Sequence, residues 1–125
     1  MNYEIPRKWE NAVNCGDLEK ILECYNNQAS LLATFQPEPI LTTKGIREYF
    51  LSFISKKEAG VSINEKSLHF FVSHESGYVV CGLYEFFFLE DEKLVRHPAR
   101  FTFVVDVDEI DKIKHHHSSL IPSFK

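Results

Sequence analysis

The sequence lacks the clustered basic residues and the long apolar runs that mark two broad classes of protein. Its formal net charge is −4, and its basic runs are as short as Arg7-Lys8 and Lys56-Lys57. Proteins that bind nucleic acid neutralise phosphates with clusters of lysine and arginine. Apolar runs such as Phe86 to Leu89 are far too short to span a bilayer. We therefore expect neither a nucleic acid nor a membrane as a partner.

Cysteine is scarce as well. Cys15, Cys24 and Cys81 are odd in number and show no CxxC spacing, which is typical of reduced, buried thiols and not of a disulfide framework. The residues up to Trp9 lack the apolar stretch of a signal peptide. Neither a phosphate-binding loop nor a dinucleotide fingerprint is present. These features predict a cytoplasmic protein without a cofactor.

Aromatic residues, in contrast, are plentiful. The 125 residues include 11 Phe and 5 Tyr, and 44% are hydrophobic. A chain of this length fits one domain with a sizeable core. We expect a single domain over residues 1–125 whose core is largely aromatic.

The first half of the chain predicts three amphipathic helices and one strand. Gly16 ends the first helix and Asp17 caps the second, while Thr42 and Thr43 offer a cap for the third. A strand over 29–35 separates the second helix from the third and ends at two prolines. The expected apolar faces are Ile5, Trp9, Ala12 and Val13, then Leu18, Ile21, Leu22 and Tyr25, and finally Ile46, Tyr49, Phe50, Phe53 and Ile54.

The second half of the chain predicts strands alone. They cover about 61–73, 78–89, 94–107 and 111–119, and the short separators between them are typical of antiparallel hairpins. An acidic run at 106–111 is a hairpin turn, because it lacks the glycine and the final glutamate of a calcium-binding loop. The order predicts one α+β domain with helices on one face of a curved antiparallel sheet.

Four motifs in this order resemble a known superfamily. They are Asn14-Cys-Gly-Asp17, Thr34-Phe-Gln-Pro-Glu38, Gly45-Ile-Arg-Glu-Tyr-Phe50, and an ending made of Arg100-Phe-Thr-Phe and His115-His-His-Ser-Ser-Leu-Ile-Pro122. The chain is similar to the nuclear transport factor 2-like (SnoaL-like) superfamily. Within it the chain resembles most the calcium/calmodulin-dependent protein kinase II association domain and its stand-alone bacterial relatives. The resemblance implies a cone, in which a strongly bent antiparallel sheet wraps around three helices and encloses a pocket. It also implies self-association as a homodimer or a larger ring.

Parity along the last strand bears on which side chains enter the pocket. One face carries Lys112, Lys114, His116 and Ser118, and the other carries Ile113, His115, His117 and Ser119. The lysines should face solvent, so His115 and His117 should face inward. On the preceding strand apolarity alone sends Phe101 and Phe103 inward, whereas the family's pocket arginine implies Arg100 inward. We follow the family for this strand.

These residues predict a pocket for a small ligand. Arg100 with His115 and His117 is typical of an anion site, and Tyr25, Tyr49 and Tyr84 are expected to line the pocket with it. The alternative for Arg100 is a structural salt bridge to Glu85. A metal site at His115 and His117 lacks an identifiable third ligand, so we expect no metal.

Two function classes follow. The first is a stand-alone oligomerising domain whose pocket binds a small carboxylate-bearing or aromatic ligand. The second is a small enzyme of the ketosteroid isomerase or SnoaL-like kind, in which Asp17 or a histidine moves a proton and Tyr25 donates to the oxyanion. No pair of carboxylates marks a catalytic centre, so whether the chain is an enzyme stays open.

Overall fold

A computed structural model describes residues 2–108 and 110–123, with the side chains of all of these except residues 73 and 74. As the sequence predicts, the three α-helices and one strand lie in the first half of the chain, and the second half is mainly strands. The elements are α1 (Ile5–Asn14), α2 (Leu18–Glu23), β1 (Tyr25–Leu32), α3 (Thr43–Ile54), β2 (Gly60–Ile63), the 3-10 turn η1 (Glu65–Ser67), β3 (His69–His74), β4 (Gly77–Glu90), β5 (Lys93–Asp106) and β6 (Lys112–Leu120). The acidic turn expected at 106–111 includes residue 109, which lies outside the described residues.

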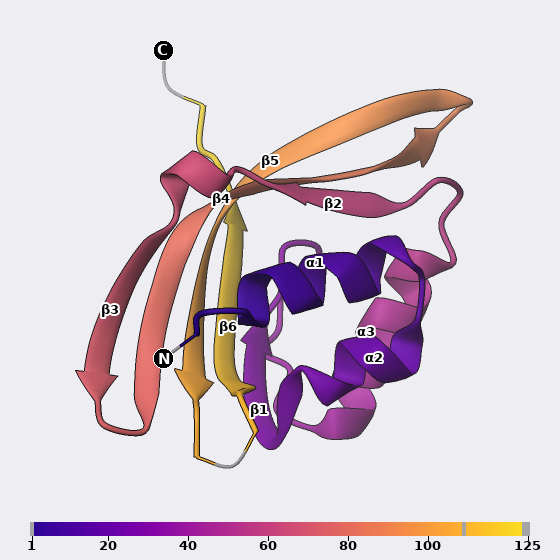
Figure 1. The fold of residues 1–125 in the computed structure, drawn as a ribbon. Helices are drawn as coiled ribbons and strands as arrows, with labels where there is room; N and C mark the ends of the chain where they lie inside the picture. Colours follow the sequence, from indigo (N-terminus) through magenta and orange to yellow (C-terminus); the bar gives the residue numbers. More distant parts are fainter. Residues whose placement is uncertain (1, 109, 124–125) are drawn as a thin grey trace.

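The six strands form one curled sheet in the order β1-β6-β5-β4-β2, and β3 pairs with another part of β4. Figure 1 shows the sheet bending around α1, α2 and α3, which all lie on its concave side. The α+β cone is therefore confirmed. One pairing differs from the expected antiparallel sheet, because β1 runs parallel to β6. The chain reaches this parallel edge through all the intervening elements, and no hairpin connects the two strands.

Capping and periodicity explain the helices. Gly16 adopts φ +64° after α1, a conformation that glycine accepts without strain. The Asp17 side chain accepts a hydrogen bond from the Lys20 backbone N–H at 3.2 Å, and Thr42 caps α3 in the same way through the Gly45 N–H at 3.0 Å. The three predicted helices are thus present, with caps at the predicted residues.

Two element boundaries differ from the prediction. The strand expected at 61–73 is interrupted by η1, where the Asn64 side chain caps the turn by accepting from the Lys66 N–H at 3.1 Å. The first strand begins at Tyr25, four residues before the predicted start at 29. Tyr25 was expected on the second helix and instead opens β1, because that helix ends at Glu23.

The free edge of β2 is satisfied by side chains of α1. The Asn14 side chain donates to the Val61 carbonyl at 2.9 Å and accepts from the Val61 N–H at 2.8 Å. Glu10 accepts from the Ile63 N–H at 2.7 Å. Asn14 and Glu10 lie one helical turn apart on α1, so the helix serves as the missing neighbour of this strand.

The core centres on Trp9, the only tryptophan of the chain, which is 0% exposed. Its ring stacks on Tyr84 at 5.5 Å and meets Phe103 edge-on at 5.4 Å. The His116 ring also meets it edge-on, at 5.4 Å. Aromatic rings therefore surround Trp9 at the centre of the core. In the described part of the chain, no helix is long and apolar enough to cross a membrane.

Candidate functional site

A bulge in β6 decides which histidine enters the core. Val104 pairs with His115 while Val105 pairs with Ile113, so Lys114 is an extra residue on this strand. Ile113 faces inward as expected and is 0% exposed. The bulge then shifts the alternation by one residue, and His116 and Ser118 follow Ile113 into the core. The expectation that His115 and His117 face inward is therefore wrong.

The expected orientation of β5 is wrong for a simpler reason. Phe101 and Phe103 are buried, at 3% and 0% exposure. Arg100 is exposed on the outer face, where it donates to the Ser119 hydroxyl at 3.2 Å. Apolarity alone therefore predicts the correct face. The alternative for Arg100, a salt bridge to Glu85, is also wrong. Glu85 instead pairs with Arg96, whose guanidinium nitrogen lies 3.2 Å from the carboxylate.

The outer histidines lie in a partly apolar setting. His115 contacts the Ser30 hydroxyl at 2.7 Å from the parallel strand β1. Partial burial, together with the nearby His117, lowers the pKa of His115. Arg100 and His117 line a shallow hollow on the outer sheet face, which also includes Ser67, Cys81, Gly82, Leu83, Phe101, Thr102 and Ser119.

The inner face carries a buried hydrogen-bonded network centred on His116. The Trp9 indole N–H donates to the Tyr25 hydroxyl at 3.0 Å. Tyr25 Oη lies 2.8 Å from Nδ1 of His116, and Tyr84 Oη lies 2.9 Å from Nε2. His116 thus bridges two tyrosines predicted as site residues, and both tyrosines are buried.

Hydrogen counting assigns the tautomer of His116. The indole N–H only donates, so Tyr25 Oη accepts this bond and its single hydrogen remains for His116 Nδ1. The proton of the neutral ring then sits on Nε2 and is donated to Tyr84 Oη. The reverse tautomer would leave the buried Tyr25 hydrogen without this acceptor, which is costly.

Burial keeps this network uncharged. It lowers the pKa of His116 to about 3, and the neighbouring His115 and His117 act in the same direction. Burial also raises the pKa of Tyr25 and of Tyr84 well above their usual range. Near neutral pH the ring is therefore a neutral imidazole between two neutral phenols.

Two small hydroxyls, of Ser118 and Thr34, lie close to Tyr84 at the border of the network. Hydrogen bonding to Ser118 and Thr34 works against the raised pKa of Tyr84, and the Thr34 and Ser118 hydroxyls contact each other directly. Burial also raises the pKa of Tyr49 on α3, to about 12. The hydrogen bonds that start at Trp9 thus reach Tyr84, and Thr34 and Ser118 form a separate bonded pair near it.

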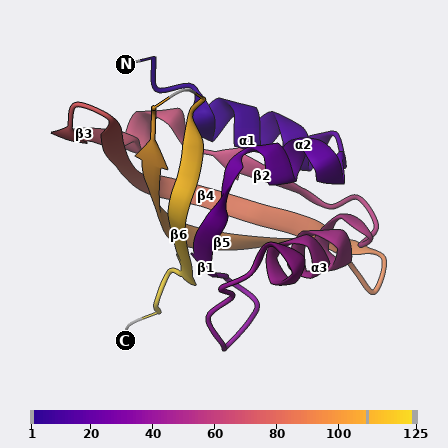
Figure 2. The same cartoon turned by 90° about the horizontal axis from the view of Figure 1, so that it is seen from below.

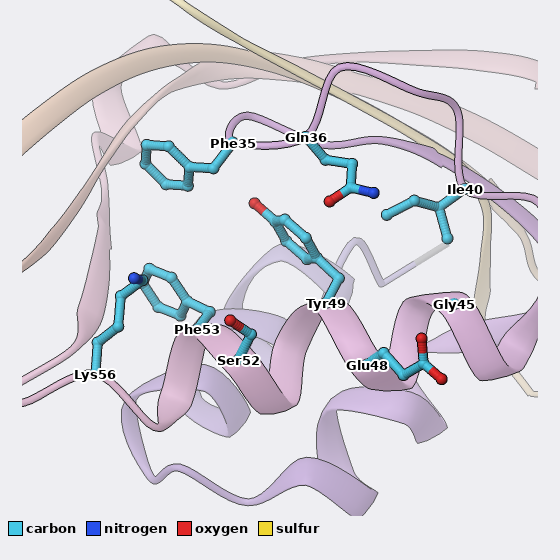
Figure 3. Close-up of a pocket in the computed structure, with 9 residues that line it drawn as sticks. All are labelled: Phe35, Gln36, Ile40, Gly45, Glu48, Tyr49, Ser52, Phe53 and Lys56. Carbon is cyan, nitrogen blue, oxygen red and sulfur yellow. The ribbon is translucent and has the colours of Figure 1, made fainter.

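Tyr49 stands in a cleft between α3 and the segment that follows β1. Figure 2 shows this segment, residues 33–42, extending beyond the end of β1 beside α3. The cleft has a volume of about 310 Å³. Figure 3 shows the Tyr49 hydroxyl pointing from α3 toward Phe35 and Gln36. The lining residues are Phe35, Gln36, Ile40, Gly45, Glu48, Tyr49, Ser52, Phe53 and Lys56.

One end of the cleft is aromatic and carries a positive charge. The Phe35 ring is 37% exposed and meets Phe88 edge-on at 5.9 Å. Lys56 Nζ lies 5.0 Å from the centre of the Phe88 ring, within the range of a cation–π contact. An aromatic surface beside a lysine amine suits a ligand that combines a flat apolar part with an anionic group.

Catalytic groups are not assembled around the buried network. Asp17 caps α2, and the Tyr25 hydroxyl is occupied by Trp9 and His116. Among residues 2–108 and 110–123, no group of three His, Cys, Asp or Glu side chains is placed to hold a metal ion. The structure therefore brings Tyr25 and Tyr84 together, places Tyr49 in the cleft, and leaves Arg100, His115 and His117 on the outer face.

Comparison with known proteins agrees with this geometry. A curled sheet around three helices with a cleft on its concave side is the fold of the nuclear transport factor 2-like superfamily. A protein of that superfamily from Salmonella enterica serovar Typhimurium superposes with a TM-score of 0.83 at 11% identity, covering 98% of this chain and 89% of its own. A ketosteroid isomerase-like protein from Erwinia carotovora atroseptica gives 0.78 at 12% identity, covering 98% and 100%. At such identities the likeness shows the fold alone.

The family follows from the sequence match. The chain belongs to the calcium/calmodulin dependent protein kinase II association domain family, whose model matches residues 3–122. One similar structure comes from Xanthomonas campestris and is described as an association domain of this kind. It superposes with a TM-score of 0.86 at 26% identity, covering 97% of this chain and 86% of its own. No curated protein matches the chain by sequence.

Proposed function

We propose that this protein is a stand-alone association domain that binds a small ligand in the cleft beside Tyr49. The observation that carries the ligand site is the cleft itself, where the Tyr49 hydroxyl, the exposed Phe35 ring and Lys56 meet. The rest of the cone interior is filled by Trp9 and its aromatic neighbours. A ligand with an aromatic part and a carboxylate fits this combination of groups.

The earlier expectation of an anion at Arg100, His115 and His117 stays a prediction. Those side chains lie on the outer face, so an anion bound there would sit outside the cone. A thermal-shift screen of small aromatic and aliphatic acids separates the two sites. A ligand at a hundred times its dissociation constant stabilises a protein by about 2.7 kcal/mol. Lys56→Ala should weaken this effect, whereas Lys57→Ala and Arg100→Ala should leave it intact.

Self-association is the second part of the proposal, and it rests on the association-domain family. The outer face of β4, β5 and β6 is a suitable surface. Thr102 pairs with Cys81 and His117 at the middle of this face, and Leu83 beside it is 39% exposed. Cys81, Thr102 and Leu83 carry no charge, and the neighbouring Arg100 donates to the Ser119 hydroxyl, so two such faces can bury each other with few unpaired charges.

Light scattering tests the association. We expect a dimer or a larger closed assembly at micromolar concentration. Thr102→Glu, which places a charge on the outer face, should shift the protein toward the monomer. Asn11→Glu adds the same charge to the exposed side of α1 and should not. A monomeric wild-type protein would remove this part of the proposal.

A small isomerase or cyclase remains the alternative function. What favours it is the Tyr49 hydroxyl in the cleft, because a phenol can donate to a developing oxyanion. Among the cleft-lining residues Glu48 is the carboxylate available as a base. Proton exchange next to a ketone carbonyl, measured in wild type and Glu48→Gln, would distinguish this alternative.

A further inference from the structure

Three of the six histidines of the chain lie on the outer face of the sheet. Directly paired residues of neighbouring strands share a face, and Thr102 of β5 pairs with His117 on one side and with Cys81 on the other. Cys81 pairs in turn with His69 of β3. His115 lies two residues before His117 on β6 and therefore shares its face. The three histidines thus lie on both sides of the surface proposed for self-association.

The neighbours of these rings are mostly uncharged groups. His69 and His117 are exposed, and His115 is half-buried. From β1, the Ser30 hydroxyl lies 2.7 Å from His115 Nδ1. The His117 ring centre lies 6.4 Å from that of His115, and Cys81 faces His69 from β4. The rings are therefore open to a second copy of the chain, and two of them lie close to each other.

The acids of this face are already matched with bases. Glu85 pairs with Arg96 at 3.2 Å, and Asp106 lies opposite Lys112 in the pairing of β5 with β6. Among the side chains that the structure describes on this face, no further carboxylate is placed to offset added positive charge. Protonation of the histidines would therefore make the outer face strongly positive.

A symmetric assembly makes this charge oppose itself. In a two-fold dimer the same patch supplies both sides of the interface, so like charges meet. Arg100 already places one positive charge on the face, where it bonds a hydroxyl and not a carboxylate. Lys114 adds another beside His115, as the exposed extra residue of the bulge. Two protonated faces would therefore repel each other, whereas two neutral ones can be buried.

We propose that pH controls the self-association of this protein through His69, His115 and His117, whose neutral rings allow two outer faces to pack and whose protonation separates them. This inference rests on the proposed function, since it specifies the regulation of the proposed outer-face interface. Burial against a second copy removes the rings from water, which disfavours their charged form. Partial burial already lowers the pKa of His115 within the single chain, and the nearby His117 acts in the same direction.

The dissociation constant of the assembly measures this effect. The association is strongest above the ordinary histidine pKa of about 6.5 and weakens as the pH falls below it. For one ring that must be neutral to be buried, the weakening between pH 7.5 and pH 5.5 is about tenfold. A two-fold dimer contains each ring twice, so we expect Kd to rise at least about a hundredfold. Analytical ultracentrifugation gives Kd at both pH values, and Trp9 fluorescence checks that the fold is intact.

Variants separate these histidines from other effects of acid. The triple variant His69→Gln, His115→Gln and His117→Gln carries neutral amides and should stay associated at pH 5.5. His97→Gln is the matched control, because His97 pairs with Glu90 at 3.0 Å and packs on the inner ring of Phe88. This control should keep the pH dependence of the wild type. His117→Arg is charged at every pH and should separate the copies already at pH 7.5, where no acid acts on the fold.

The outcomes distinguish this inference from the proposed association itself. An assembly at pH 7.5 whose Kd is unchanged at pH 5.5 would overturn the inference and leave self-association intact. A triple variant that still dissociates in acid, or a His117→Arg protein that stays associated, would overturn it as well. A wild-type protein that is monomeric at pH 7.5 would instead remove the proposed self-association, and the inference with it.

Discussion

The phenolic oxygen of Tyr84 lies 2.9 Å from Nε2 of His116, and the two side chains are exposed by only 2% each. A titratable ring is therefore bonded through both nitrogens inside the aromatic core, where burial keeps it neutral. Burial lowers its pKa to about 3, while a histidine in the unfolded chain titrates near 6.5. This difference couples the stability of the fold to pH.

Acid should destabilise the protein through His116. Between about pH 6.5 and about pH 3 the unfolded chain binds a proton at this residue and the folded protein does not, so the free energy of unfolding decreases as the pH falls. One such proton corresponds to about 1.4 kcal/mol per pH unit. Urea unfolding followed by Trp9 fluorescence at several pH values measures the slope. In His116→Gln the slope should be smaller by about this amount, and equal slopes would contradict the assigned pKa.

The edge of β2 should depend on Asn14. This side chain makes two hydrogen bonds with the Val61 backbone, at 2.8 and 2.9 Å. Asn14→Ala should lower the free energy of unfolding by about 1–3 kcal/mol, because a strand edge loses both partners. Asn11→Ala, on the exposed side of the same helix, is the control and should change it by less than about 0.5 kcal/mol. If both variants lost similar amounts of stability, the loss would come from helix propensity and not from the hydrogen bonds at the edge of β2.

The bulge at Lys114 predicts an unusual tolerance to deletion. Removing Lys114 leaves Ile113 and His116 inward with His115 between them, which is the regular alternation of a strand. Removing His117 instead would turn the buried Ser118 outward. Deletion of Lys114 should therefore cost clearly less stability than deletion of His117, as measured by thermal unfolding. The opposite order would mean that the register of β6 is different.

Metal removal should have no effect on stability. The described residues place no three metal-binding side chains together, and a structural metal would contribute to the folding free energy. We expect millimolar EDTA to leave the melting temperature unchanged. A drop of several degrees, restored by adding a divalent ion, would contradict this prediction.

Local signals explain what could be predicted from the sequence. Helix periodicity and caps such as Asp17 and Thr42 act over a few residues, so they located the three helices. The split between β2 and β3 depends on Asn64 capping a short turn within an apolar stretch, and this signal is weak beside the strand pattern. The parallel pairing of β1 with β6 joins segments about ninety residues apart, which no local pattern specifies.

The candidate site was harder to predict because it depends on one extra residue. Alternation in β6 is regular in the sequence, and the bulge at Lys114 arises from pairing with β5. His116 was therefore placed on the wrong face, and with it Ser118. Arg100 was misplaced for another reason, since the burial of Phe101 and Phe103 was a better guide than the family's pocket arginine. Lys56 was not singled out, because its role depends on Phe88 from a distant strand.

We propose that the ligand binds in the cleft beside Tyr49 and not at Arg100 on the outer face. Amide NMR spectra recorded during titration with the acid that stabilises the protein most would locate the site directly. We expect the largest shifts at Phe35 and Gln36, and from Tyr49 in α3 to Lys56 just after this helix. Shifts concentrated at Arg100, His117 and Ser119, with the cleft unperturbed, would contradict it.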